Sequence, residues 1–102
     1  MAHVESYSHA TSGTIPSGGW AVAWFTISSW KGFIQSFPGF MSQRLSIRSD
    51  DNGDVRFQTV VVWSEVEQLE EWVSSQWSAE SLLASLDPPA QNVVSESFAD
   101  LS

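Results

Sequence analysis

The longest helical pattern in the chain lies between positions 20 and 36. Apolar residues recur at positions 20, 23, 24, 27, 30, 34 and 37, a spacing that places side chains on one face of a helix. The first half, Trp20 to Ile27, is also rich in residues that favour strands, so both structures remain open for residues 20–27. No turn signal interrupts the segment before Pro38-Gly39, and this length favours one helix over 20–36.

A strand pattern precedes this helix. Residues 3–10 alternate weakly, with Glu5, Tyr7 and His9 on one face. Residues 11–19 are rich in Ser, Thr, Gly and Pro, which predicts a loop.

Asn52-Gly53 is the strongest hairpin signal in the chain, and it joins strands predicted over 40–49 and 55–63. If these two residues form the centre of the turn, Arg44 pairs with Val61 and shares a face with Trp63. That face would carry Phe40, Ser42, Arg44, Ser46, Arg48, Phe57, Thr59, Val61 and Trp63. Both faces of the hairpin are substantially apolar, so we expect helices to cover one and a second subunit to cover the other.

A second, acidic helix is predicted over 64–77. Ser64 is a candidate N-cap, and Glu67 completes a capping box. The expected buried stripe consists of Val66, Leu69, Val73 and Trp77.

The C-terminal part predicts a short helical turn over 79–86 and a last strand over 92–98, followed by a frayed tail from Ala99. The element order is β-α-β-β-α-β, the ferredoxin-like arrangement of the α+β class. The 102 residues predict a single domain, with its core over about 3–98.

Charge and composition exclude several functions. The net charge is -8 and only four residues are basic, which argues against nucleic acid and anionic membranes as partners. The chain has no Cys, and its start lacks the features of a signal peptide, so we expect a cytoplasmic protein. The absence of Cys and the presence of only two His, His3 and His9, argue against a metal site.

Three short motifs resemble the antibiotic biosynthesis monooxygenase (ABM) family. They are Phe-Pro-Gly-Phe at 37–40, Val-Val-Trp-Ser at 61–64 and Glu-Glu-Trp-Val-Ser-Ser at 70–75. The resemblance implies a homodimeric α+β barrel with a pocket between each sheet and its own helices. It also implies, for several members, oxidation of polycyclic phenols without metal or flavin.

Another branch of this family binds and degrades haem, and the chain departs from its pattern. Trp72 matches the Trp that this branch has on its second helix. The position about ten residues later, where this branch has a His, is Leu82, and the first strand has no Asn. The sequence therefore does not fit haem degradation.

Five residues are candidates for binding or chemistry. His9 is a candidate proton acceptor, because an imidazole titrates near neutral pH; the alternative is an exposed or dimer-facing His. Tyr7 and Arg44 are candidates for contacts with a ligand oxygen. The alternative for Tyr7 is a packed core or interface side chain, and the alternative for Arg44 is an ion pair across a dimer. Trp63 and Trp72 are candidates for the walls of a pocket, and the alternative is that they only fill the core.

The resulting hypothesis is a small homodimeric ABM-like protein that binds a flat aromatic molecule and oxidises it without a cofactor. In this hypothesis His9 or a water takes the proton, Arg44 holds the phenolate, and Trp63 and Trp72 orient the ring. A non-catalytic binding or regulatory module, a structural domain without a pocket, and an isomerase or lyase are the alternatives.

Overall fold

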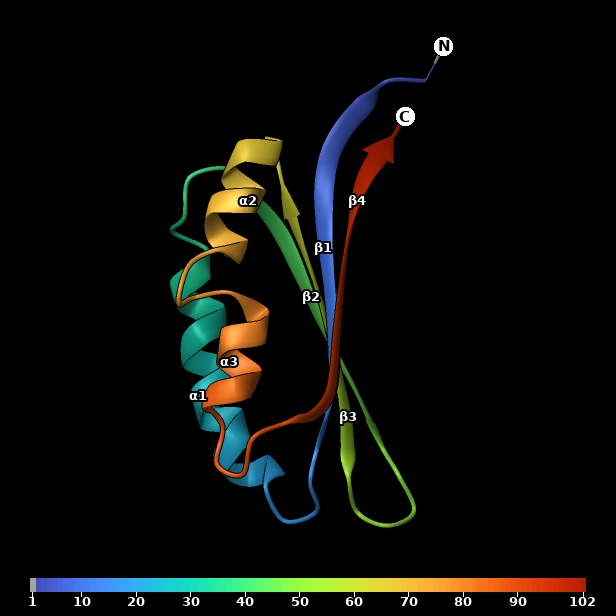
Figure 1. Ribbon diagram of the computed structural model, residues 1–102, viewed down its shortest axis with the longest axis vertical. Coiled ribbons are helices and arrows are strands. Elements are labelled where there is room, and N and C mark those ends of the chain that lie inside the picture. Colours follow the sequence, from blue (N-terminus) through green and yellow to red (C-terminus); the bar gives the residue numbers. More distant parts are fainter. Residues whose placement is uncertain (1) are drawn as a thin grey trace.

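The computed structural model describes residues 2–102, and it has two layers: an antiparallel sheet and a layer of helices on one of its faces (Figure 1). The elements in chain order are β1 (Val4–Ile15), α1 (Trp20–Ile34), β2 (Phe40–Ser49), β3 (Val55–Trp63), α2 (Val66–Val73), α3 (Ala79–Ser85) and β4 (Gln91–Leu101). The strand order is β2-β3-β1-β4. This confirms the predicted ferredoxin-like arrangement, with its second helix divided into α2 and α3.

Residues 20–34 form a helix, so the strand alternative for residues 20–27 is wrong. Ala23, Ile27, Trp30 and Ile34 are buried, and their spacing places them on the face that meets the sheet. The chain then turns at Gly39, whose φ is +85°. A Cβ atom there would lie 1.7 Å from Oε1 of Gln68, so this turn requires glycine.

The β2–β3 hairpin has a different register from the predicted one. Arg44 lies opposite Val60, one residue away from the expected Val61. The cause is the turn: the amide of Gly53 donates to the carbonyl of Asp50, and Gly53 has a φ of +88°. Residues 51–53 thus form a longer loop than a two-residue turn, and Asn52 accepts a hydrogen bond from the amide of Asp54 through its side chain.

This register changes which residues share a face. Along β3, Val55, Phe57, Thr59, Val61 and Trp63 are buried under the helices. Arg44 pairs with Val60 and therefore lies on the opposite face from Trp63, so the predicted shared face is wrong.

The predicted helix over 64–77 ends earlier than expected. α2 stops at Val73, where the Ser75 hydroxyl donates to the carbonyl of Trp72. The predicted capping box does not form, because Ser64 donates to the Gln68 side chain and the N-cap is Glu65. The predicted turn over 79–86 is α3, whose N-cap Ser78 accepts from the amide of Ser81.

The central strand is longer than its sequence pattern suggested. Residues 11–15, predicted as loop, belong to β1, because β3 and β4 flank it on both sides and satisfy its backbone groups. The tail predicted to fray is part of β4, and Leu101 pairs with Val4.

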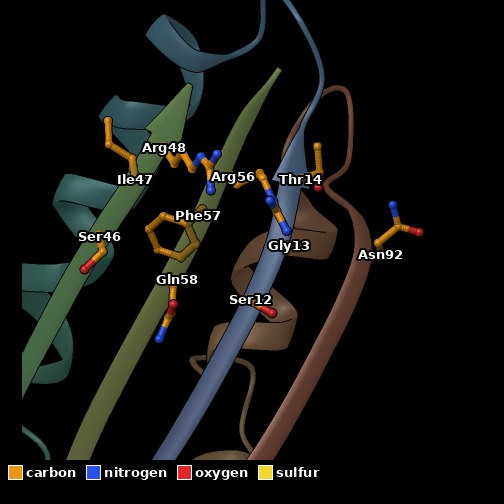
Figure 2. Close-up of a pocket in the computed structure, with 10 residues that line it drawn as sticks. All are labelled: Ser12, Gly13, Thr14, Ser46, Ile47, Arg48, Arg56, Phe57, Gln58 and Asn92. Atoms are coloured by element: carbon orange, nitrogen blue, oxygen red, sulfur yellow. The ribbon is translucent and has the colours of Figure 1, made fainter. Parts of the chain in front are cut away.

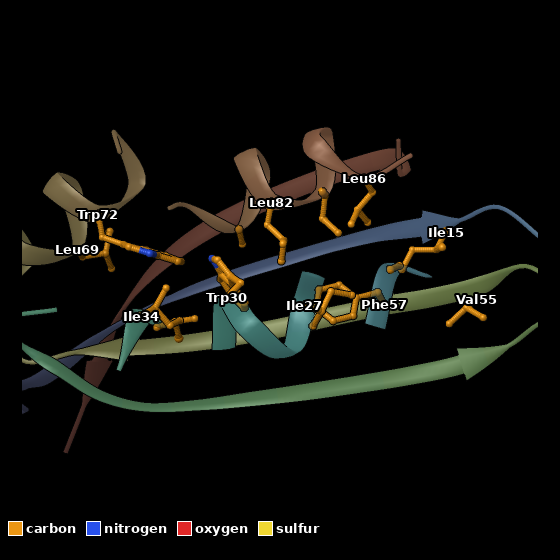
Figure 3. Close-up of a cluster of buried hydrophobic side chains, with 14 of the residues drawn as sticks. Ile15, Ile27, Trp30, Ile34, Val55, Phe57, Leu69, Trp72, Leu82 and Leu86 are labelled. Carbon is orange, nitrogen blue, oxygen red and sulfur yellow. The ribbon is translucent and has the colours of Figure 1, made fainter. Parts of the chain in front are cut away.

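The core lies between the sheet and the helices (Figure 3). Large side chains from every layer fill this space, and Phe57, Trp63 and Trp72 are almost fully buried. The opposite face of the sheet, which we call the open face, is not covered by any helix of residues 2–102 (Figure 1). Val94 and Phe98 of β4 are 57% and 50% exposed, and they lie on the open face through their pairing with Ser12 and Ser8.

Candidate functional site

His9 lies on the helix-facing side of β1 and is buried, with both ring nitrogens in contact with polar partners. Its Nδ1 is 2.7 Å from Oγ of Ser97 on β4. Its Nε2 is 3.1 Å from Oε1 of Glu80 on α3. The expectation of an exposed or dimer-facing His is therefore wrong in this chain, since only 4% of His9 is exposed.

Glu80 connects this buried imidazole to solvent, because about a third of its side chain (34%) is exposed. Burial raises the pKa of Glu80, but the hydrogen bond and charge of His9, together with a hydrogen bond from Thr11, outweigh it and hold the pKa below its ordinary value. The Thr11 hydroxyl donates to the same Oε1 at 3.2 Å. Such a pair can hold a proton and exchange it with solvent through the carboxylate.

An aromatic cluster lies beside the imidazole. The ring of Trp72 meets His9 edge-on at 5.6 Å, and the Trp63 ring lies 5.1 Å from Trp72. Tyr7 lies opposite Trp63 in the sheet. The structure thus brings Tyr7, His9, Trp63 and Trp72 together on one face. Trp63 and Trp72 pack as core residues here, and their role as pocket walls stays a prediction.

Arg44 is separate from this cluster, on the open face of the sheet and exposed to solvent. The sheet itself lies between its guanidinium and the imidazole of His9. Within residues 2–102 the only ion pair joins His9 and Glu80, so Arg44 has no carboxylate partner there. A site that combines Arg44 with His9 and Trp72 does not exist in a single chain.

A groove with a volume of about 700 Å³ lies between α1 and α3, and we call it the α1/α3 groove. Its lining residues are neutral, and half of them are aromatic or aliphatic: Phe25, Thr26, Ser29, Trp30, Phe33, Gln76, Trp77, Ser81, Leu82 and Ser85. Phe33 and Trp77 stack at its edge, with ring centres 4.1 Å apart and ring planes 27° apart. The volume and the neutral aromatic lining suit a small flat molecule.

The floor of the groove is fixed by hydrogen bonds. The carbonyl of Trp77 accepts from Nε1 of Trp30 at 2.7 Å and from Nε1 of Trp72 at 2.9 Å. Trp72 also contacts His9, so one indole connects the groove floor to the His9–Glu80 pair. His9 itself does not line the groove.

Sequence reasoning missed Glu80 and Ser97, and it assigned Trp77 to the buried stripe of a helix, whereas Trp77 lines the groove. Glu80 lies two residues after Ser78, and a Ser followed by an acidic residue is the usual start of a helix. That signal places Glu80 in the first turn of α3, but not against His9. The groove depends on how α3 packs on α1, which no local pattern encodes.

Comparison with known proteins supports the fold. No protein-family model matches the chain, and no curated protein shows significant similarity to it. Three similar solved structures are SnoaB, a cofactor-independent oxygenase from Streptomyces nogalater, and two candidate antibiotic biosynthesis monooxygenases, from Caulobacter crescentus and Nitrosomonas europaea. For SnoaB the TM-score is 0.69 at 15% identity, covering 94% of this chain and 93% of that chain.

The other two structures give similar values. The Caulobacter protein has a TM-score of 0.74 at 10% identity, over 97% of this chain and 92% of that chain. The Nitrosomonas protein has a TM-score of 0.72 at 8% identity, over 96% of this chain and 92% of that chain. The chain therefore has the fold of the antibiotic biosynthesis monooxygenases, as its motifs indicated.

Two further features of residues 2–102 are relevant to function. None of their helices is long and apolar enough to span a membrane. No group of three or more His, Asp or Glu side chains in this range gathers in a way that could hold a metal ion.

Proposed function

We propose that this protein binds a flat aromatic small molecule in the α1/α3 groove. The observation that carries the proposal is the stacked Phe33–Trp77 pair at the edge of a neutral groove of about 700 Å³. Ring stacking on such a pair contributes about 0.5–1.5 kcal/mol beyond the burial of apolar area. Among residues 2–102 no charged side chain lines the groove, so we expect the ligand surface that enters it to be uncharged.

Binding without catalysis is the function that this geometry supports best. His9 has partners at both ring nitrogens and does not line the groove, so a bound ligand does not touch it directly. The residues expected to act together, Arg44 and His9, lie on opposite faces of the sheet.

Cofactor-independent oxidation of the ligand is the second candidate function. It is supported by the fold shared with SnoaB and by the buried His9–Glu80 pair near the groove floor. In this reaction a phenol or enol loses a proton, and the resulting anion supplies electrons to O₂. His9 is the candidate acceptor, and the proton reaches it indirectly because the imidazole does not line the groove. A CH₂ group becomes C=O, so one oxygen atom enters the substrate and the other leaves as water.

A titration with two related probes tests both candidates. Anthraquinone cannot undergo this reaction, whereas anthrone can, with consumption of one O₂ per molecule. We expect anthraquinone to bind, as measured by calorimetry, and Phe33→Ala to weaken binding about three- to tenfold. Trp24→Ala is the matched control, because Trp24 and Phe33 are both on α1 and about equally exposed, at 44% and 45%, and Trp24 does not line the groove.

The outcomes separate the two functions. Binding of both probes without O₂ uptake above the uncatalysed rate supports the binding protein. Enzyme-dependent O₂ uptake with anthrone that is lost in His9→Gln supports the oxygenase. If neither probe binds, or if Trp24→Ala weakens binding as much as Phe33→Ala, the groove is not the site.

We further propose that the protein is a cytoplasmic homodimer, with the open faces of two sheets packed together. Val94 and Phe98 support this, because half-exposed apolar side chains on a sheet face are favourable to bury. The packing would also cover the face that the helices of residues 2–102 leave uncovered.

A further inference from the structure

The open face has its charges separated by sign. Its three arginines, Arg44, Arg48 and Arg56, lie on β2 and β3, whereas its acidic residues, Glu96 and Asp100, lie on β4. The strand order β2-β3-β1-β4 therefore places the positive and the negative groups on opposite halves of the face. No helix of residues 2–102 covers either group (Figure 1), so a second molecule with the reverse order of charges fits this face.

Arg44 is the arginine of this face without an acidic neighbour along the chain. Arg48 and Arg56 pair with each other at the hairpin end (Figure 2), and each has an aspartate two positions away, Asp50 and Asp54 respectively. The residues two positions before and after Arg44 are both serines, and within residues 2–102 Arg44 forms no ion pair. Arg44 thus retains an exposed charge that a second molecule can neutralise.

Glu96 requires a cation when the open face is buried. On this face Val94 and Phe98 flank it, two positions away on either side, and they are 57% and 50% exposed. A second sheet that covers these two side chains also removes the carboxylate of Glu96 from water, which is costly for an unpaired charge. Within residues 2–102 Glu96 has no cationic partner. The molecule that covers this face must therefore place a cation opposite Glu96.

The strand register puts Arg44 and Glu96 at the two ends of one row of the sheet. Arg44 of β2 pairs with Val60 of β3, Val60 pairs with Ala10 of β1, and Ala10 pairs with Glu96 of β4. A two-fold axis that lies between two such sheets and runs parallel to the strands reverses the order of the strands and keeps each row at its level. It therefore places Arg44 opposite the partner's Glu96 and Val60 opposite the partner's Ala10.

The other face-to-face orientation has its two-fold axis across the strands. Each strand then lies over the same strand of the second subunit, so the arginines of β2 and β3 face each other. Repulsion between like charges disfavours this orientation. Packed sheets are about 10 Å apart, a distance that an arginine and a glutamate side chain can bridge together.

We propose that two copies of this chain pack their open faces about a two-fold axis parallel to the strands, with Arg44 of each subunit in an ion pair with Glu96 of the partner subunit. This inference rests on the homodimer proposed above, and it adds the orientation of the two sheets and the residues that select it. Because the contact is symmetric, it occurs twice in each dimer.

Exchange of the two charges tests this orientation by light scattering coupled to gel filtration. Arg44→Glu and Glu96→Arg each create two repulsive contacts in a dimer, and each should raise the dimer dissociation constant about tenfold or more at low salt. The double variant Arg44→Glu/Glu96→Arg restores both contacts with reversed charges, and its dissociation constant should lie within about threefold of the parent value.

A mixture of the two single variants provides a second readout. One subunit then carries Arg44→Glu and the other carries Glu96→Arg, so both contacts in the heterodimer join opposite charges. The mixture should form this heterodimer at concentrations at which neither variant dimerises alone. Both positions are exposed, so each single variant should keep the circular dichroism spectrum of the parent protein.

Asp100 supplies the control for the exchange. It lies on the same face of β4, but its carboxylate accepts hydrogen bonds from Ser6 and Ser8 of its own chain, and its partner Ser6 lies beyond the residues of β1 that pair with β3. The double variant Arg44→Glu/Asp100→Arg has the same net charge as the charge exchange and should dissociate as readily as Arg44→Glu alone.

The outcomes distinguish this orientation from the dimer itself. If the parent protein is dimeric but Arg44→Glu/Glu96→Arg dissociates as readily as the single variants, the orientation is wrong and the proposed dimer stands. Equal restoration by Arg44→Glu/Asp100→Arg would also overturn the orientation, because net charge would then account for the effect. A monomeric parent protein would overturn both the orientation and the dimer.

Discussion

Nε2 of His9 and Oε1 of Glu80 lie 3.1 Å apart, although the two residues are 71 positions apart in the chain. This contact joins the central strand to the first turn of α3, and Thr11 donates to the same carboxylate oxygen. The pair is therefore both a candidate proton-transfer group and a tertiary contact that holds α3 on the sheet.

The Glu80 contact predicts a pH dependence of stability. Because folding lowers the pKa of Glu80 below its ordinary value of 4.5, the stabilisation is complete above that value. It is lost as the pH falls through the lower pKa of the folded state. Glu80→Gln should lower the free energy of unfolding by about 1 kcal/mol at pH 7, a value reduced for partial solvent exposure. Between pH 5 and pH 3 the unfolding free energy of this variant should decline less than that of the parent protein.

Urea unfolding at several pH values measures this effect. Glu67→Gln is the matched control, because Glu67 is also an acidic residue in the first turn of a helix but is exposed. Equal losses of unfolding free energy in both variants would show that an acidic residue at the start of a helix accounts for the effect and that the contact with His9 contributes nothing.

Local patterns in the sequence were sufficient to predict the helices, the strands and their order. The spacing of Ala23, Ile27, Trp30 and Ile34 encodes the buried face of α1, and the strands over 40–49 and 55–63 lie where predicted. Short-range periodicity and turn residues carry this information directly.

The candidate site depended on features that local patterns do not encode. The side chains of Asn52 and Asp54 stabilise a longer loop, and one residue of register moved Arg44 away from Trp63. The His9–Glu80 contact requires α3 to pack beside β1. The open face illustrates the same limit: three arginines in the sequence do not reveal that two of them are direct neighbours.

Two glycines should respond in opposite directions to alanine. A Cβ atom on Gly32 would meet nothing within 4 Å, so Gly32→Ala should stabilise α1 by about 0.5–1 kcal/mol. Gly39→Ala combines a positive φ with a clash against Gln68, and it should cost about 1–3 kcal/mol. Chemical unfolding of both variants measures these values.

A double variant separates the two costs at Gly39. Adding Gln68→Ala removes the contacts with Oε1 and Cδ and leaves the tight Cβ contact at 3.0 Å and the backbone strain, so Gly39→Ala should cost less in that background. If Gly39→Ala lowers the unfolding free energy equally with and without Gln68→Ala, the whole effect comes from the backbone. If Gly39→Ala does not change the unfolding free energy, the turn differs from the one described.

The opposed arginines predict a stabilising substitution. Arg48→Gln removes repulsion from Arg56 across the strands and should raise the unfolding free energy by about 0.2–1 kcal/mol at low salt. High salt should reduce the gain, because exposed charges are screened. Thermal unfolding at two salt concentrations measures this, with Arg44→Gln as the variant in which no gain is expected.

The open face predicts how the protein associates. If two sheets pack through this face, Phe98→Glu places a charge in the centre of an apolar contact and should convert a dimer into a monomer. Phe25→Glu is the control: its side chain is 77% exposed and lies on the helical side, so this variant should keep the association state of the parent protein. Light scattering coupled to gel filtration measures the mass of each variant. A parent protein that is monomeric at about 100 μM would contradict the proposed dimer, because a face-to-face packing of standard interface size normally persists at that concentration.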